Sequence, residues 1–152
     1  MAQFATGITV LTVPGEGCHG MTANAFSSVS LDPPLVLCCV DRTARLHKAI
    51  TEAGCYAVSM LGADQEGLAR YFADRRRPDG SAQFDAVDWV PGAHTGAPLL
   101  SGSLAWLECE LVDACAGGDH SIFIGRVLNS RSTASRQPLV FFGGAFHQVA
   151  QV

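Results

Sequence analysis

Short apolar runs alternate with polar turns along this chain, which is typical of a protein built mostly from β-strands. Residues 8–13 (ITVLTV) place β-branched side chains beside threonines and predict a strand. Residues 18–30 predict a second strand region, interrupted by Asn24 and two serines. The continuous apolar run 35–40 predicts a strand buried on both faces. Four later segments with similar patterns predict further strands, at residues 56–61, 104–112, 122–128 and 139–142.

Two segments instead have the spacing of amphipathic helices. Residues 43–52 carry Leu46 and Ile50 on one side, and Gly54 ends the segment, while residues 65–73 carry a second apolar stripe. Strands outnumber helices by about two to one, and the connections between them are too short for repeated βαβ crossovers. These features predict a mainly β protein, most economically a closed antiparallel barrel with peripheral helices.

Composition narrows the class of protein. The 152 residues are 48% hydrophobic and 16% charged, which excludes intrinsic disorder and predicts a single domain over residues 1–152. So few charges also suggest that some apolar surface is hidden in an oligomer. The net charge of -4 argues against a general nucleic-acid binder, because phosphate contacts need clustered basic residues.

The chain shows no apolar run of 18 or more residues, so we expect no membrane span. The first residues lack a basic segment followed by a small-residue cleavage site, which predicts a cytoplasmic protein. There is no CxxC pair and the histidines are scattered, so no metal site is expected. The cysteines lie mostly in apolar runs and are interpreted as reduced core residues: Cys18, Cys38, Cys39, Cys55, Cys109 and Cys115.

The segment 20–36 is unusually polar for a strand that only builds a core. Short hydrogen-bonding side chains are concentrated in it: Thr22, Asn24, Ser27, Ser28 and Ser30. Such side chains leave room for a flat ring and can bond its heteroatoms, as an isoalloxazine would require. An edge strand with a solvated face would show the same pattern. The chain carries no GxSxG, P-loop or GxGxxG motif, so a nicotinamide would not be held on a dedicated dinucleotide fold.

Residues 20–44 (GMTANAFSSVSLDPPLVLCCVDRTA) strongly resemble the flavin reductase-like family, whose members have the FMN-binding split β-barrel fold. This fold is antiparallel and Greek-key-like, with a few peripheral helices. The resemblance continues in the family's order through almost the whole chain, at residues 4–10, 53–58, 68–73, 96–100, 118–120 and 138–142. It implies a homodimer that reduces FMN or FAD with NADH or NADPH and passes reduced flavin transiently to a flavin-dependent monooxygenase.

The resemblance also implies which residues form a flavin groove where two subunits meet. One wall, along the ring and ribityl chain, is expected from Thr22, Ala23, Asn24 and Ala25, with Ser27 and Ser28 near the ribityl or phosphate group. The second wall is expected from Cys39, Asp41, Arg42 and Thr43, and Phe72 is expected to close over the flavin. Arg42 is suited to a phosphate, with Arg45 in reserve. Without the resemblance, both arginines are simply a solvated helix start.

The chain departs from the family at one basic position. Many members place an arginine or lysine just before the Phe that here is Phe84, but this chain has Gln83. Arg75–Arg77 lie upstream in a polar loop, and Arg77 is the residue expected to replace the missing charge. Three arginines in a loop are also often only solvated. FMN and FAD therefore remain equal alternatives.

The resemblance assigns turnover to one histidine. The motif Gly118-Asp119-His120 brings His120 near the face where the nicotinamide stacks, and His47 is the next candidate contact. From the residues alone, this motif is only a hairpin turn. The predicted activity is NAD(P)H:flavin oxidoreductase. The alternatives are a split-barrel oxidase or nitroreductase-like enzyme with tightly bound flavin, and a flavin- or haem-binding protein without turnover.

Overall fold

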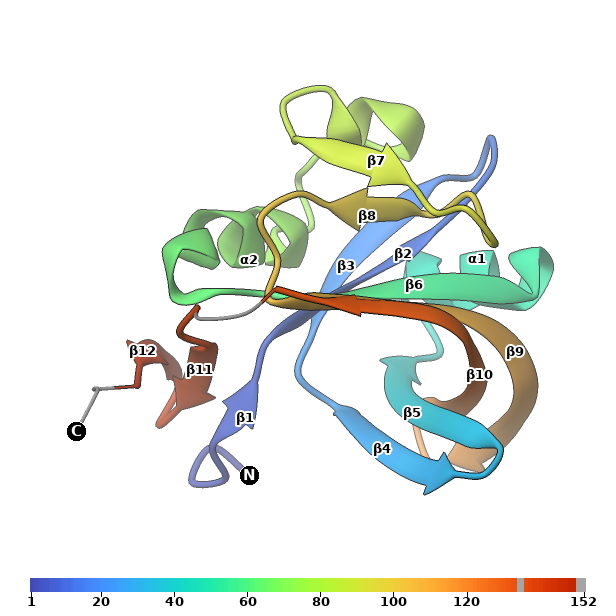
Figure 1. Ribbon diagram of the computed structural model, residues 1–152, viewed down its shortest axis with the longest axis horizontal. Helices are drawn as coiled ribbons and strands as arrows, with labels where there is room; N and C mark the ends of the chain where they lie inside the picture. Colours follow the sequence, from blue (N-terminus) through green and yellow to red (C-terminus); the bar gives the residue numbers. More distant parts are fainter. Residues whose placement is uncertain (134–135, 150–152) are drawn as a thin grey trace.

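The computed structural model describes residues 1–133 and 136–149. Its centre is a seven-stranded antiparallel sheet in the order β3-β2-β6-β9-β10-β5-β4 (Figure 1). The strands of this sheet are β2 (Thr9–Val13), β3 (His19–Ala23), β4 (Phe26–Leu31), β5 (Pro34–Asp41), β6 (Cys55–Met60), β9 (Ala105–Gly117) and β10 (His120–Ser132). Smaller sheets combine β1 (Thr6–Gly7) with β11 (Leu139–Phe142) and β12 (Ala145–Gln148), and β7 (Trp89–Pro91) with β8 (Pro98–Leu100).

The large sheet curls strongly but does not close. Its terminal strands, β3 and β4, follow each other in the chain and are joined only through Asn24 and Ala25. Figure 1 shows β3 running down into β4 while the long β9–β10 hairpin bends around the other side. The expectation of a closed barrel was therefore wrong, whereas the split antiparallel barrel implied by the family resemblance is the fold observed. A sheet can remain open in this way when other elements cover its free edges.

Both expected helices are present. Helix α1 (Arg45–Ala53) ends where predicted, because Gly54 adopts φ 66° and its N–H donates to Ile50 O. Helix α2 (Glu66–Ala73) buries Ala69 and Phe72 against the sheet. The polar loop expected at residues 75–83 is partly helical, because its last residues belong to the 3-10 turn η2 (Gly80–Phe84). Another 3-10 turn, η1 (Ala63–Gln65), precedes α2.

Several strand predictions need correction. The region 18–30 is two strands, because the chain turns at Asn24 and Ala25. Strand β5 alternates buried with half-buried positions, so it is not buried on both faces. β9 and β10 are longer than expected, because β9 continues beyond its pairing with β6 and β10 pairs with β9 from His120 to Ser132. The strands β1, β7, β8 and β12 are too short to leave a recognisable pattern in the sequence.

Two apolar clusters hold these elements together. One fills the barrel and includes Tyr56, Cys38 and Phe123; the other packs α2 against β2 and β11. All six cysteines are free, as expected, but Cys115 is exposed on the β9–β10 hairpin and is not a core residue. No helix in the described part of the chain is long and apolar enough to cross a membrane.

Candidate functional site

A cavity of about 340 Å³ lies between β3, the end of β5, the start of α1 and the end of α2. Five residues expected at the flavin line it: Thr22, Asp41, Thr43, Phe72 and Arg77. The remaining lining residues are His19, Met21, Ala44, Arg45, Ala73 and Arg75. Three arginines and one carboxylate therefore face one cavity, and this donor set is suited to an anion.

The approach to α1 contributes further donors to the cavity. Asp41 Oδ1 accepts hydrogen bonds from the Thr43 hydroxyl and the Thr43 N–H, both at 2.7 Å, and these bonds lower the pKa of Asp41. Ala44 is the N-cap of α1 and offers no side-chain bond to the first turn. Backbone N–H groups at a helix start favour negative charge, so this wall is also suited to a phosphate.

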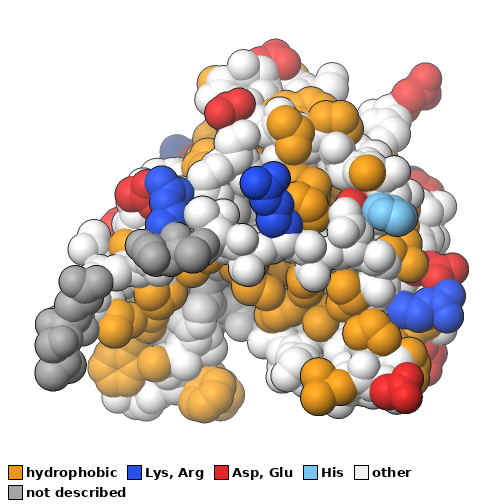
Figure 2. Space-filling view, in the orientation of Figure 1, with side chains coloured by type: hydrophobic (Ala, Val, Ile, Leu, Met, Phe, Trp, Pro, Cys, Tyr) orange, Lys and Arg blue, Asp and Glu red, His pale blue; other side chains and the backbone are white. Residues whose placement is uncertain are grey.

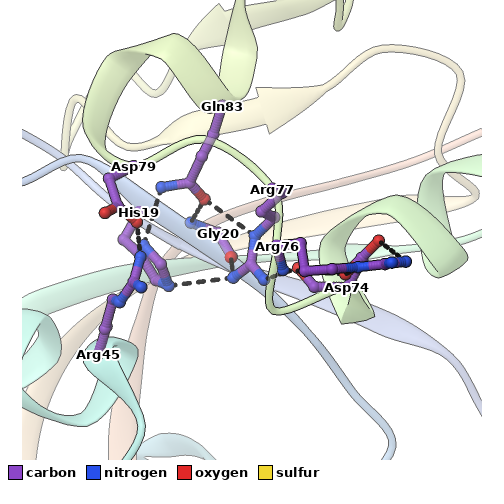
Figure 3. Close-up of polar contacts among 8 residues, drawn as sticks. All are labelled: His19, Gly20, Arg45, Asp74, Arg76, Arg77, Asp79 and Gln83. Carbon is purple, nitrogen blue, oxygen red and sulfur yellow. Dashed lines mark hydrogen bonds and ion pairs between the residues drawn. The ribbon is translucent and has the colours of Figure 1, made fainter.

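Arg77 and His19 line the cavity, and the buried Gln83 contacts both of them without lining it (Figure 3). Arg77 Nε donates to Gln83 Oε1 at 3.2 Å, Nη1 donates to Asp74 O at 2.7 Å, and Nη2 donates to Gly20 O. Its Nη2 also lies 3.1 Å from Nε2 of His19. Arg77, the residue expected to replace the missing charge, is thus in direct contact with Gln83, which stands where many family members have a basic residue. Burial, together with the nearby Arg45, lowers the pKa of Arg77.

His19 is buried in this cluster. Gln83 Nε2 lies 2.8 Å from its Nδ1, so donor groups stand at both ring nitrogens. Burial lowers the pKa of His19 to about 4, and the charges of Arg77 and Arg45 add to the effect. The imidazole is therefore neutral near neutral pH.

The remaining cavity walls are fixed by contacts between β3 and α2. The Thr22 hydroxyl donates to Ala69 O at 2.7 Å, which ties the strand to the helix and leaves the Thr22 oxygen free to accept. Phe72 is fully buried, and its ring centroid lies 5.5 Å from that of Phe84. Ala23, in contrast, points into the barrel core and away from the cavity.

Other residues expected at the flavin lie on a different surface of this protomer. Asn24 lines a second, mostly apolar hollow of about 360 Å³ with Phe26 and the N-terminal segment. Figure 2 shows this face hollowed between the small β1–β11–β12 sheet and the lobe that carries β4. Ala25, Ser27 and Ser28 are exposed at the start of β4 or just before it. A single chain therefore brings only part of the expected groove together.

Cys39 and Arg42 lie close to the cavity without lining it. Cys39 is half-buried on β5, and its N–H donates to Ala25 O, which links the two expected walls. Arg42 is exposed, and its N–H donates to Asp119 O. That second bond places the β9–β10 turn directly beside the start of α1.

His120 lies at the rim of the same region. It is the register partner of Asp41 in the β5–β10 ladder, and its Nδ1 lies 2.8 Å from Asp119 Oδ1. His47 faces elsewhere: its Nε2 lies 2.8 Å from Ser121 Oγ, and its ring packs 5.0 Å from that of Phe123. Of these two histidines, His120 is therefore the one whose partner in the β5–β10 ladder, Asp41, lines the cavity.

Sequence reasoning missed two ionisable members of the cavity. His19 received no role, because its partner Arg77 is 58 residues away and no local spacing reveals that contact. Arg75 was noted only as part of a basic run, and the structure places it on the cavity wall. Arg45, held in reserve, also lines the cavity and forms an ion pair with Asp79.

Comparisons with known proteins establish the family of this chain. The family described as the flavin reductase like domain matches residues 1–150, so the chain belongs to the flavin reductase-like family. It is 50% identical over 148 residues to an NADH-dependent FAD reductase of Streptomyces globisporus, covering 97% of this chain and 81% of that protein.

A solved structure and one further relative have names that mention ligands or partner proteins. The structure of the S. globisporus NADH:FAD oxidoreductase SgcE6 in complex with NAD and FAD fragments superposes with a TM-score of 0.93 at 48% identity, covering 98% of this chain and 88% of that one. HsaB of Rhodococcus jostii, the reductase subunit of a flavin-dependent monooxygenase, is 35% identical over 96% of this chain and 73% of its own length.

Proposed function

We propose that this protein is an NADH-dependent flavin reductase that supplies reduced FMN or FAD to a separate flavin-dependent monooxygenase. Membership of the flavin reductase-like family supports the reaction, and the names of its relatives support NADH as donor and a monooxygenase as recipient. The observation that carries the proposal is the cavity on which Arg45, Arg75 and Arg77 converge beside the start of α1. This donor set fits the phosphate of a flavin nucleotide.

The residues of the chain would bind and orient rather than react. The flavin supplies the redox chemistry when bound, by taking up a hydride from a reduced nicotinamide. Arg45 and Arg75 are exposed and can turn toward a phosphate, while Arg77 is held in place by its protein contacts. Thr22 keeps an oxygen free to accept, and the side chains of Phe72 and Met21 give the cavity an apolar wall that excludes water.

His120 is the proposed contact for the nicotinamide. Asp119 Oδ1 is an acceptor at 2.8 Å from Nδ1, so the proton of the neutral ring sits on Nδ1. Nε2 is then left as an acceptor, and the carboxamide N–H of a nicotinamide is a matching donor. In this role His120 holds the dinucleotide and moves no proton.

A homodimer would complete the groove. Ala25, Ser27 and Ser28 lie outside the cavity on the β4 side, where Val29 and Leu31 are also exposed. Leu31 is 95% and Val29 46% exposed, so two neighbouring apolar side chains of β4 face solvent. We propose that a second copy covers this face and brings its polar residues toward a bound flavin.

Stopped-flow mixing of NADH with the protein and flavin tests the function. A flavin reductase bleaches the flavin absorbance rapidly and then releases reduced flavin that an added monooxygenase consumes. An oxidase or nitroreductase-like enzyme would keep its flavin bound and need an organic substrate, and a carrier would show no bleaching. Either of those results would overturn the proposal.

His120→Ala tests the nicotinamide contact. Loss of one hydrogen bond is expected to raise the KM for NADH by about tenfold, with flavin affinity unchanged. Steady-state kinetics with NADH varied at saturating flavin measure this effect. His47→Ala is the matched control and should leave the KM nearly unchanged. If the His120 variant keeps the wild-type KM, the assignment fails.

A further inference from the structure

Arg77 is a half-buried cation whose observed partners are all neutral. Its guanidinium donates to the Gln83 amide oxygen and to the backbone oxygens of Asp74 and Gly20. The Asp74 carboxylate is turned away and bonds Arg76 instead. Within the described residues, no carboxylate forms an ion pair with Arg77.

Neutral side chains fix the position of this guanidinium. Gln83 is fully buried, and its Oε1 faces two donors, the N–H of Gly20 and the Nε–H of Arg77. The amide orientation is thereby determined, and Nε2 must point at Nδ1 of His19. A neutral imidazole accepts at only one ring nitrogen, so His19 accepts from either Gln83 Nε2 or Arg77 Nη2, and in the part of the chain that the structure describes a second proton on the ring would face only donors.

The same contacts occupy the backbone groups of Gly20 at the free edge of β3. Gly20 N–H and Gly20 O, which a neighbouring strand would otherwise bond, are taken by Gln83 and Arg77 (Figure 3). The neutral partners of Arg77 are therefore themselves tied to the backbone of β3. A positive charge that is partly removed from water and has no counter-ion carries a desolvation cost, which an anion in the adjoining cavity would offset.

We propose that His19 and Gln83 are positioning residues that hold Arg77 at the cavity wall without neutralising it, so that its charge acts on a nucleotide phosphate. The identity of the ligand as a nucleotide rests on the proposed function. The phosphate belongs either to the flavin nucleotide or to the dinucleotide, and both present the same anionic group. Arg77 then acts mainly through its charge, because much of its hydrogen-bonding capacity is already used by the protein.

Gln83→Glu separates charge from geometry. A glutamate has the same shape and can accept from Gly20 N–H, from Arg77 Nε–H and from His19 Nδ1–H, so the contacts of the cluster are kept. It adds a negative charge directly against the guanidinium. We therefore expect a melting temperature equal to or above that of the wild type, together with weaker binding of phosphate-bearing ligands.

The measurement is the dissociation constant of FMN and of riboflavin, followed by flavin fluorescence at low salt. Riboflavin has the same ring and no phosphate. For Gln83→Glu we expect FMN to bind about tenfold or more weakly while riboflavin changes by less than about twofold. The FMN dissociation constant of the variant should also depend less on salt.

Gln65→Glu is the matched control. Gln65 is also buried and accepts from a backbone N–H, that of Gly62, but neither Gly62 nor its other partner, Ser101, lines the cavity. Its substitution should leave the ratio of FMN to riboflavin affinity unchanged. His19→Gln, which keeps a neutral polar group, should retain most of the FMN affinity, whereas His19→Leu should reduce it by releasing Arg77.

A second pair of ligands shows which molecule carries the phosphate. With riboflavin as electron acceptor, the KM is measured for NADH and for reduced nicotinamide riboside, which has no phosphate. A selective loss with NADH places the dinucleotide at Arg77, and a selective loss with FMN places the flavin nucleotide there. If Gln83→Glu changes neither ratio, the positioning role is wrong, even though wild-type reduction of flavin by NADH would still support the proposed function.

Discussion

At the scale of single residues, one buried carboxylate away from the cavity needs several hydrogen bonds to remain charged. Glu108 on β9 is fully buried, and its Oε1 accepts from Thr95 N–H at 2.8 Å, His94 N–H at 2.9 Å and the Thr95 hydroxyl at 2.9 Å. Asn129 donates to its Oε2 at 3.0 Å. Burial alone would raise the pKa of Glu108, but these hydrogen bonds outweigh it and lower the pKa. Glu108 thus anchors the loop between β7 and β8.

Glu108→Leu is expected to reduce the free energy of unfolding by about 3 kcal/mol, because several buried donors lose a charged acceptor. Urea unfolding measures the loss, and Glu108→Gln should lie between the leucine variant and the wild type. Glu110→Gln is the control, since Glu110 forms only a partly exposed ion pair with Arg126 and should cost less than about 1 kcal/mol. Equal losses for Glu108→Leu and Glu110→Gln would contradict this account.

At the scale of elements, the fit between β3 and α2 shapes the cavity. A Cβ on Gly20 would lie 2.7 Å from Phe72 Cε1 and 3.2 Å from Phe84 Cζ, so the strand can approach these rings only as glycine. The same residue bonds Gln83 and Arg77 through its backbone. Packing and the polar cluster therefore depend on one close approach.

Gly20→Ala is expected to lower the free energy of unfolding by about 1–3 kcal/mol through overpacking, and to weaken flavin binding because Phe72 must move. Urea unfolding and flavin fluorescence measure the two effects. Gly17→Ala, on the preceding turn where an added Cβ would meet nothing within 4 Å, should stay within about 0.5 kcal/mol of the wild type. A stable Gly20 variant with full flavin affinity would show that the strand and helix adjust freely.

Much of this element pattern was predictable from the sequence, for identifiable reasons. β2, β6 and both helices have clear periodicity, and Gly54 ends α1 as its conformational freedom allows. β7 was not predictable, because it has three exposed residues and includes a proline. The cavity was only partly predictable, since Thr22 and Asp41 stand in family motifs but the contact of His19 with Arg77 depends on the tertiary fold.

At the scale of the whole molecule, the proposed dimer predicts that Leu31 is buried between the two copies. Leu31→Arg should not affect folding of the protomer, because the side chain is 95% exposed. In a dimer that buries this face, an arginine there would be desolvated without a partner. We expect the variant to shift toward monomer by at least about tenfold in dissociation constant. Sedimentation at several concentrations measures the shift.

Val90→Arg is the control for this experiment. Val90 is also an exposed apolar residue, at 53%, but it lies on β7 and away from β4. Its substitution should leave the association state unchanged. If the Leu31 variant associates as the wild type does, the copy-to-copy contact must use another face.

The two edge strands of the large sheet, β3 and β4, differ in whether side chains block their free backbone groups, and this difference affects how copies could pair. The β3 edge is blocked at Gly20 by the side chains of Arg77 and Gln83, whereas no side chain makes such contacts with the β4 edge in the residues that the structure describes. Growth of a fibre by edge-to-edge strand pairing needs an unpaired edge strand on each side of every copy. If copies of the proposed dimer met through this sheet, a blocked β3 would stop edge-to-edge growth after two copies. The residues that hold the arginine in place would then also oppose open-ended polymerisation.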